Sequence, residues 1–217
     1  MPTNVALTGL ARDLAVRGDS GRPIRIGLVG SGEMGTDIVA RVAHMPGIEV
    51  GAISELNLPN ARKAVAIAYG DEARAEETTG GDALNAAIEA GRIALTSDVS
   101  AIIDSGLIDV VVDATGVPSV GAEIGLAAME AGKHLVMMNV EADVTIGAYL
   151  RSEAERLGVV YSLGAGDEPS SCMEIIEFVS AMGHRVVSAP CRRGRAARPG
   201  RRSAAPPGTS GGRAGIR

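Results

Sequence analysis

The sequence lacks any apolar run that approaches the roughly 20 residues a membrane-spanning helix needs. Its opening residues, MPTNVALTGLARDL, lack the basic-then-apolar order of a secretory signal. It has only two cysteines, Cys172 and Cys191, and their spacing fits neither a disulfide framework nor a metal site. From these absences we expect a cytoplasmic protein with no membrane partner and no bound metal.

Lysine is also scarce, with two residues against 19 arginines. Residues 190–217 hold eight arginines and no acid, so the net charge of −5 divides into −13 for the body and +8 for this tail. Arg, Gly, Ala and Pro dominate the tail, a composition that cannot build a packed core, and we expect it to be disordered. Its cations could bind phosphates, but it has no aromatic residue to stack on bases. We therefore expect no nucleic-acid partner.

Between residues 25 and 162, short β-branched runs alternate with longer Ala-rich segments of helical period. This alternation is typical of βαβ units, and continuous apolar runs are typical of strands covered on both faces. The predicted strands are 24–30, 48–53, 93–96, 108–114, 134–138 and 159–163. The predicted helices are 5–17, 33–45, 59–69, 81–90, 98–104, 119–131, 146–157 and 172–183. With right-handed crossovers they predict an α/β fold, a doubly wound parallel sheet of the Rossmann NAD(P)-binding type.

The pattern also predicts four segments along the chain. Residues 1–22 form an N-terminal helical extension, and residues 23–168 form the Rossmann dinucleotide-binding domain. Residues 169–189 form the first helix and the strand start of a truncated substrate domain, and residues 190–217 form the disordered tail.

The most informative motif is IRIGLVGSGEMG, in which Gly30, Gly32 and Gly35 follow a strand and open a helix. Gly30 permits the tight turn, Gly32 lets the pyrophosphate approach the backbone, and Gly35 lets the helix pack on the strand. Free N–H groups at the helix start favour a phosphate anion. The motif predicts a cofactor loop made of Gly30, Ser31, Gly32, Glu33, Met34 and Gly35. A simple turn is the alternative, but the strand before and the helix after favour the binding loop.

An acid about 20 residues later, Glu55, stands at the tip of the second predicted strand. A carboxylate there accepts hydrogen bonds from the ribose 2′-hydroxyl and repels a 2′-phosphate, which favours NAD. Arg62 and Lys63 follow closely and leave NADP open. A solvated loop acid is the alternative for Glu55.

Two further loops follow strands at the carboxyl edge, where open α/β sheets bind ligands. Ala114, Thr115 and Gly116 are small enough for a dinucleotide to pass close, and Asn139 could hydrogen-bond the nicotinamide or its ribose. Simple strand-to-helix turns are the alternative for both loops.

No catalytic group stands out from the residues. Asp167 and Glu168, in the run SLGAGDEPSS, could bind a substrate amine or hydroxyl or relay a proton, and Glu141 is a third candidate. Adjacent loop residues usually point apart, so a helix-capping or solvated role for Asp167 and Glu168 stays open.

The stretches IRIGLVGSGEMGTDIVARV, DATGVP, GKHLVMMNVEADVTIG and YSLGAGDEPSSCMEIIEFVSA resemble the homoserine dehydrogenase-like oxidoreductases that carry a C-terminal SAF domain. That group includes the second type of 1-deoxy-D-xylulose 5-phosphate reductoisomerase. The resemblance spans residues 5–189. It implies a nicotinamide site at Gly30 to Gly35, at Thr115 and Gly116, and near Asn139. It also implies a substrate bound between this domain and a following one, and a homo-oligomeric full-length protein.

Two departures from that family are visible. Authentic homoserine dehydrogenases have a lysine where this chain has Val140, which argues against homoserine as substrate. After Ala189 the family pattern gives way to an Arg-, Ala-, Pro- and Gly-rich stretch of the composition that a shifted reading frame in a GC-rich gene would yield. We expect a truncated or frameshifted product that lacks the catalytic domain.

The resemblance implies an NAD(P)-dependent oxidoreductase that transfers hydride between nicotinamide and a small hydroxy or oxo substrate. A sugar-phosphate or polyol-type compound would match the reductoisomerase-like members. The alternative is a catalytically silent dinucleotide-binding fragment or redox sensor that lacks the substrate domain.

Overall fold

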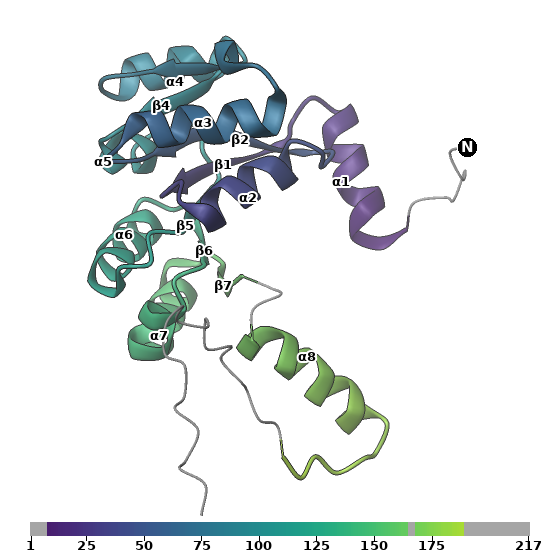
Figure 1. The fold of residues 1–217 in the computed structure, drawn as a ribbon. Coiled ribbons are helices and arrows are strands. Elements are labelled where there is room, and N and C mark those ends of the chain that lie inside the picture. Colours follow the sequence, from purple (N-terminus) through teal and green to yellow (C-terminus); the bar gives the residue numbers. More distant parts are fainter. Residues whose placement is uncertain (1–7, 165–167, 189–217) are drawn as a thin grey trace, which may run out of the picture. The chain divides into compact units, whose positions relative to one another are not determined.

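A computed structural model describes residues 8–164 and 168–188 of the chain (Figure 1). These residues fall in two units, Met1–Gly166 and Asp167–Arg217, and the sheet belongs to the first. The predicted disordered tail, residues 190–217, lies outside the described residues, as does Asp167.

The sheet of the first unit has seven parallel strands in the order β3-β4-β2-β1-β5-β6-β7. The strands are β1 (Ile24–Val29), β2 (Ile48–Ser54), β3 (Ala75–Glu77), β4 (Ile93–Thr96), β5 (Val110–Asp113), β6 (His134–Met137) and β7 (Tyr161–Leu163). The chain runs outward from β1 in one direction through β2 and returns to its other side with β5, so a topological switch point lies between β1 and β5. The predicted doubly wound parallel sheet is confirmed.

The helices are α1 (Gly9–Asp19), α2 (Glu33–Val42), α3 (Leu58–Tyr69), α4 (Gly81–Glu89), α5 (Val99–Ile103), α6 (Pro118–Glu130), α7 (Val140–Leu157) and α8 (Glu168–Ala181). A short 3-10 helix, η1 (Glu72–Arg74), precedes β3. None of the described helices is long and apolar enough to cross a membrane.

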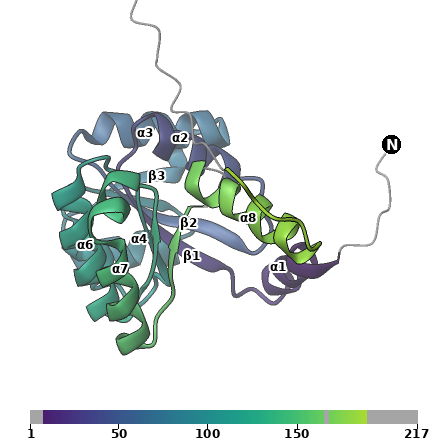
Figure 2. The ribbon, with the colours of Figure 1, turned by 90° about the horizontal axis from the view of Figure 1, so that it is seen from below.

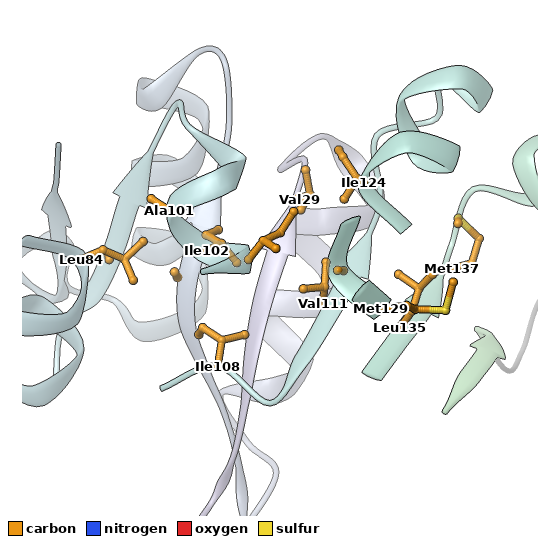
Figure 3. Close-up of a cluster of buried hydrophobic side chains, with 14 of the residues drawn as sticks. Val29, Leu84, Ala101, Ile102, Ile108, Val111, Ile124, Met129, Leu135 and Met137 are labelled. Carbon is orange, nitrogen blue, oxygen red and sulfur yellow. The ribbon is translucent and has the colours of Figure 1, made fainter. Parts of the chain in front are cut away.

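Helices α2 to α7 cover both faces of the sheet (Figure 2). On one face, Val39 of α2 and Val65 of α3 pack with Leu28 and Ile53 of the strands. On the other face, side chains of α4 to α7 form a second cluster with strand residues (Figure 3). Strands buried from both sides explain why their sequences read as continuous apolar runs.

Three details differ most from the sequence-based expectation, beside smaller shifts at element ends such as that of α2, which ends at Val42 and not at 45. Strand β3 was not predicted, because it is only three residues long and two of them, Glu76 and Glu77, are charged, as an edge strand permits. The expected helix 146–157 begins at Val140, because the Asn139 side chain accepts a hydrogen bond from the N–H of Ala142 and caps an earlier start. Helix α8 begins at Glu168, four residues before the predicted start at 172.

Candidate dinucleotide-binding site

The glycine loop connects β1 to α2 and is shaped by close backbone approaches. Gly30 has a φ of +90°, and a Cβ there would lie 2.8 Å from the carbonyl oxygen of Ala114 in the loop after β5. A Cβ on Gly35 would overlap the carbonyl oxygen of Gly30. Only glycine fits these two positions without displacing backbone.

Gly32 differs from the other two glycines because nothing lies within 4 Å of a Cβ built on it. It is the N-cap residue of α2 and offers no side-chain cap, so the first N–H groups of the helix are left for another partner. Gly32, Glu33 and Met34 are exposed at this helix start. An anion can therefore reach the open end of α2, as a pyrophosphate requires.

Glu55 follows the last residue of β2 and turns toward this loop. Its Oε2 accepts hydrogen bonds from the backbone N–H and the side-chain hydroxyl of Ser31, both at 2.8 Å, and its Oε1 accepts from the N–H of Asn57 at 3.1 Å. Partial burial raises the pKa of Glu55, but hydrogen bonds from Ser31, Asn57 and Leu56 outweigh it, so the pKa lies below the usual value. The Glu55 carboxylate is thus held ionised beside the glycine loop.

A cleft of about 350 Å³ opens beside the glycine loop, between α2 and α3. It is lined by Ser31, Gly32, Glu33, Thr36, Asp37, Asn60, Lys63 and Ile67. Of the two cations considered for NADP, Lys63 lines this cleft, whereas the Arg62 guanidinium pairs with Glu77 of β3 at 2.8 Å. The structure thus leaves Lys63 as the cation beside the glycine loop and directs Arg62 away from it, a difference that the sequence could not predict.

On the other side of β1, the loops after β5 and β6 contain the remaining predicted contacts. Ala114 and Thr115 are half-buried beside Gly30, and Gly116 is exposed. Asn139 is 2% exposed, and its side-chain oxygen accepts from the N–H of Ala142, so its side chain is enclosed at the start of α7. Its predicted contact with the nicotinamide stays a prediction.

Sequence reasoning missed Asp113, the last residue of β5. Its side chain is fully buried, and its Oδ1 accepts a hydrogen bond from the N–H of Thr115 at 3.1 Å. The sequence did contain a signal for it, because an acidic residue at the end of an apolar strand is buried only where its carboxylate has hydrogen-bond partners. Asp113 shapes the loop that the sequence did predict.

Two of the three candidate catalytic carboxylates lie among the described residues, each in a different unit of the chain. Glu141 is exposed in the first turn of α7, and Glu168 is the first residue of α8 in the second unit. Asp167 lies outside the described residues. Within residues 8–164 and 168–188, no three His, Cys, Asp or Glu side chains are grouped so that they could hold a metal ion.

Comparison with known families gives this site its context. The sequence profile of the family described as homoserine dehydrogenase, NAD binding domain, matches residues 30–163. The chain therefore belongs to the homoserine dehydrogenase NAD-binding domain family. The matched range begins at the first glycine of the loop and ends with β7, so this NAD-binding domain includes each of the strand-end loops described above. The expected relationship to homoserine dehydrogenases is confirmed, while the SAF domain, the reductoisomerase relationship and the truncation stay predictions.

Solved structures share the fold of this NAD-binding domain. An NAD binding oxidoreductase from Klebsiella pneumoniae matches with a TM-score of 0.52 and 19% identity, over 74% of this chain and 39% of its own. The WlbA dehydrogenase from Bordetella pertussis, solved in complex with NADH and UDP-GlcNAcA, matches with a TM-score of 0.52 and 20% identity, over 75% of this chain and 43% of its own. The chain thus spans about two fifths of the length of these proteins. A search of curated proteins found no significant match.

Proposed function

We propose that this chain binds NAD through the glycine loop and serves as the cofactor domain of an oxidoreductase. In that reaction, hydride passes between the nicotinamide and a small hydroxy or oxo substrate. The observation that supports this most is the pairing of an open helix end at Gly32 with an ionised Glu55 fixed against Ser31. The first suits a pyrophosphate and the second suits a ribose diol.

The residues present fit a dinucleotide across the switch point. The adenosine half would lie on the β2 side, where Glu55 ends the strand, with the pyrophosphate at the start of α2. The nicotinamide half would then lie on the β5 side, near Thr115 and Gly116. The nicotinamide supplies the hydride chemistry, and the chain's own residues bind and orient it.

Charge around the glycine loop supports NAD over NADP. The cleft has two carboxylates, Glu33 and Asp37, against the single ammonium of Lys63, and Glu55 lies beside it. A 2′-phosphate would add negative charge to this acidic surrounding. Lys63 is the cation that could offset part of that repulsion.

The experiment is calorimetric titration of the purified chain with NADH and with NADPH, in the wild type and in Gly32→Asp. An aspartate is a good N-cap, so Gly32→Asp keeps α2 while its carboxylate repels the pyrophosphate. Gly106→Asp is the matched control, because a Cβ there also meets nothing within 4 Å and Gly106 lies in the loop before β5, at the opposite edge of the sheet. We expect NADH to bind the wild type and Gly106→Asp but not Gly32→Asp. Absence of binding to all three would reject the proposed function.

The substrate and the partners follow from the same proposal. A sugar-phosphate or polyol-type substrate, held by a further domain, and a homo-oligomeric assembly would match the family resemblance. Helix α8 supports self-association, because Ile175 and Phe178 are about two thirds exposed. No observation on the described residues favours the alternative of a silent binding module, which would bind NADH without turnover.

A further inference from the structure

Two buried polar side chains on the nicotinamide side of the sheet have unused hydrogen-bonding groups. Asp113 ends β5 and Asn139 follows β6, and both are almost completely buried. Asp113 Oδ2 and Asn139 Nδ2 are enclosed and lack a hydrogen-bond partner among the described residues. Buried polar atoms in proteins nearly always have a hydrogen-bond partner, so two unpaired ones call for a physical explanation.

The two unpaired atoms are complementary and close together. A Cβ built on Gly121 of α6 would overlap Asp113 Oδ2 and would lie 2.9 Å from Asn139 Nδ2. The two atoms therefore border the same point under α6. One is an acceptor, and the other is a donor.

The orientation of each side chain is set by its other polar atom. Asp113 Oδ1 accepts from the N–H of Thr115, and Asn139 Oδ1 accepts from the N–H of Ala142. Since an N–H needs an oxygen acceptor, Asn139 must direct its amide nitrogen the other way. Each residue thus fixes the backbone of a different loop with one atom and presents its second atom to the same enclosed point.

We propose that Asp113 and Asn139 form one buried polar pair, in which Asn139 Nδ2 donates to Asp113 Oδ2 through a single enclosed water. The pair positions the loops after β5 and β6 relative to each other. The strands are already joined there, because the N–H of Met138 donates to the carbonyl of Asp113 at 2.9 Å. Gly121 supplies the space for the pair.

This inference rests on the proposed function in one respect only. Both loops lie on the β5 side of β1, where the nicotinamide half of the cofactor would bind. Asp113 and Asn139 are buried, so they act through the loops as positioning residues. Loss of the pair is expected to weaken the nicotinamide contacts and to spare the adenosine contacts on the β2 side.

A reciprocal exchange tests the pair. In Asp113→Asn, two amide N–H donors face each other and no acceptor remains. In Asn139→Asp, two carboxylate oxygens face each other and no donor remains. The double variant restores a donor and an acceptor with reversed polarity, and each side chain keeps an oxygen for its backbone N–H. Asp98→Asn is the matched control, because Asp98 caps α5 through Ser100 N–H but is exposed at the end of β4.

Two readouts are measured for each variant: the thermal midpoint of unfolding, and the affinities for NADH and for ADP by calorimetry. We expect each single variant to unfold at a lower temperature and to bind NADH about tenfold more weakly, with ADP affinity within about twofold of wild type. The double variant should recover most of both losses, and Asp98→Asn should match wild type. A single variant that fails to fold must be rescued in the double variant.

The outcomes separate the two levels of the proposal. Additive losses in the double variant, or its failure to fold, would overturn the pair. Equal losses of NADH and ADP affinity would overturn the positioning role. If wild type binds neither ligand, the proposed function fails, while the midpoints of wild type and the three pair variants still decide whether Asp113 and Asn139 are coupled.

Discussion

Ser31 and Glu55 form a double hydrogen bond, in which the backbone N–H and the hydroxyl of Ser31 both donate to Oε2 of Glu55 at 2.8 Å. Ser31 belongs to the glycine loop after β1, and Glu55 belongs to the turn after β2. The contact joins the predicted pyrophosphate loop to the predicted ribose acid. It holds the carboxylate in one place and keeps it ionised.

Removing the Ser31 hydroxyl should loosen Glu55 while leaving the fold intact. In Ser31→Ala, the backbone N–H still donates to Glu55, but one of the two bonds is lost. We expect NADH affinity to fall by about two- to twelvefold, the range that a single hydrogen bond of about 0.5–1.5 kcal/mol supports. Calorimetric titration measures this, with Ser20→Ala as a control because its hydroxyl donates to Arg17 O near the end of α1, away from the glycine loop. Unchanged NADH affinity in Ser31→Ala would show that the hydroxyl has no role in binding.

Acidification should remove the stabilisation that Glu55 provides. Its pKa in the folded state lies below the ordinary value of 4.5, so the carboxylate stabilises the fold above that value and the effect is lost as pH falls through the folded pKa. We expect wild type to be more stable than Glu55→Gln at pH 7 and the difference to shrink progressively as pH falls below 4.5. Urea unfolding at a series of pH values measures the difference. A constant difference across this range would contradict the assigned bonds.

Alanine should have different effects at two glycines of the same loop. In Gly35→Ala the new methyl group overlaps the carbonyl of Gly30, and overpacking of this kind costs typically about 1–3 kcal/mol. In Gly32→Ala the methyl group meets no protein atom, so stability should stay within about 0.5 kcal/mol. Denaturant midpoints measure both. The same Gly32→Ala protein should nevertheless bind NADH more weakly, because the methyl group lies where the pyrophosphate approaches.

Substitution of Lys63 should change the relative affinities for NADPH and NADH, whereas substitution of Arg62 should not. Lys63 lines the cleft beside the glycine loop, whereas Arg62 pairs with Glu77. We expect Lys63→Ala to reduce NADPH affinity at least about fivefold more than NADH affinity, the loss of about 1 kcal/mol of charge interaction. Arg62→Ala should change the ratio of the two affinities by less than about twofold. A larger change in Arg62→Ala than in Lys63→Ala would contradict the assignment of the cleft.

Alkaline pH should weaken the contact between β7 and α7. The Tyr161 hydroxyl donates to Asp143 Oδ1, and burial together with this carboxylate raises the pKa of Tyr161 above its ordinary value of 10.0. A raised pKa means that the stabilisation is complete below pH 10 and is lost as pH rises through the folded pKa. We expect the unfolding midpoint of wild type to fall above pH 10 and that of Tyr161→Phe to fall less. Tyr149→Phe, at an exposed position of α7, should behave like wild type.

The local pattern of the chain was sufficient to predict most of the fold. The apolar runs at β1, β2, β4, β5, β6 and β7 each became a parallel strand, because strands covered on both faces must be apolar along their whole length. The glycine spacing predicted the loop before α2, because two of its positions exclude any Cβ. The short strand β3, with Glu76 and Glu77 beside one buried alanine, had no such signal.

Contacts between residues that lie far apart in the chain could be seen only in the tertiary structure. By itself, the sequence determined the doubly wound sheet, the glycine loop and the acid at Glu55, because each follows from local burial or local backbone geometry. Only the fold decided that Glu55 bonds Ser31, that Lys63 rather than Arg62 lines the cleft, and that Asp113 and Asn139 share one enclosed point under Gly121. The physical reason is the parallel sheet, which brings the carboxyl ends of its strands to one edge and so places together residues that lie far apart in the chain.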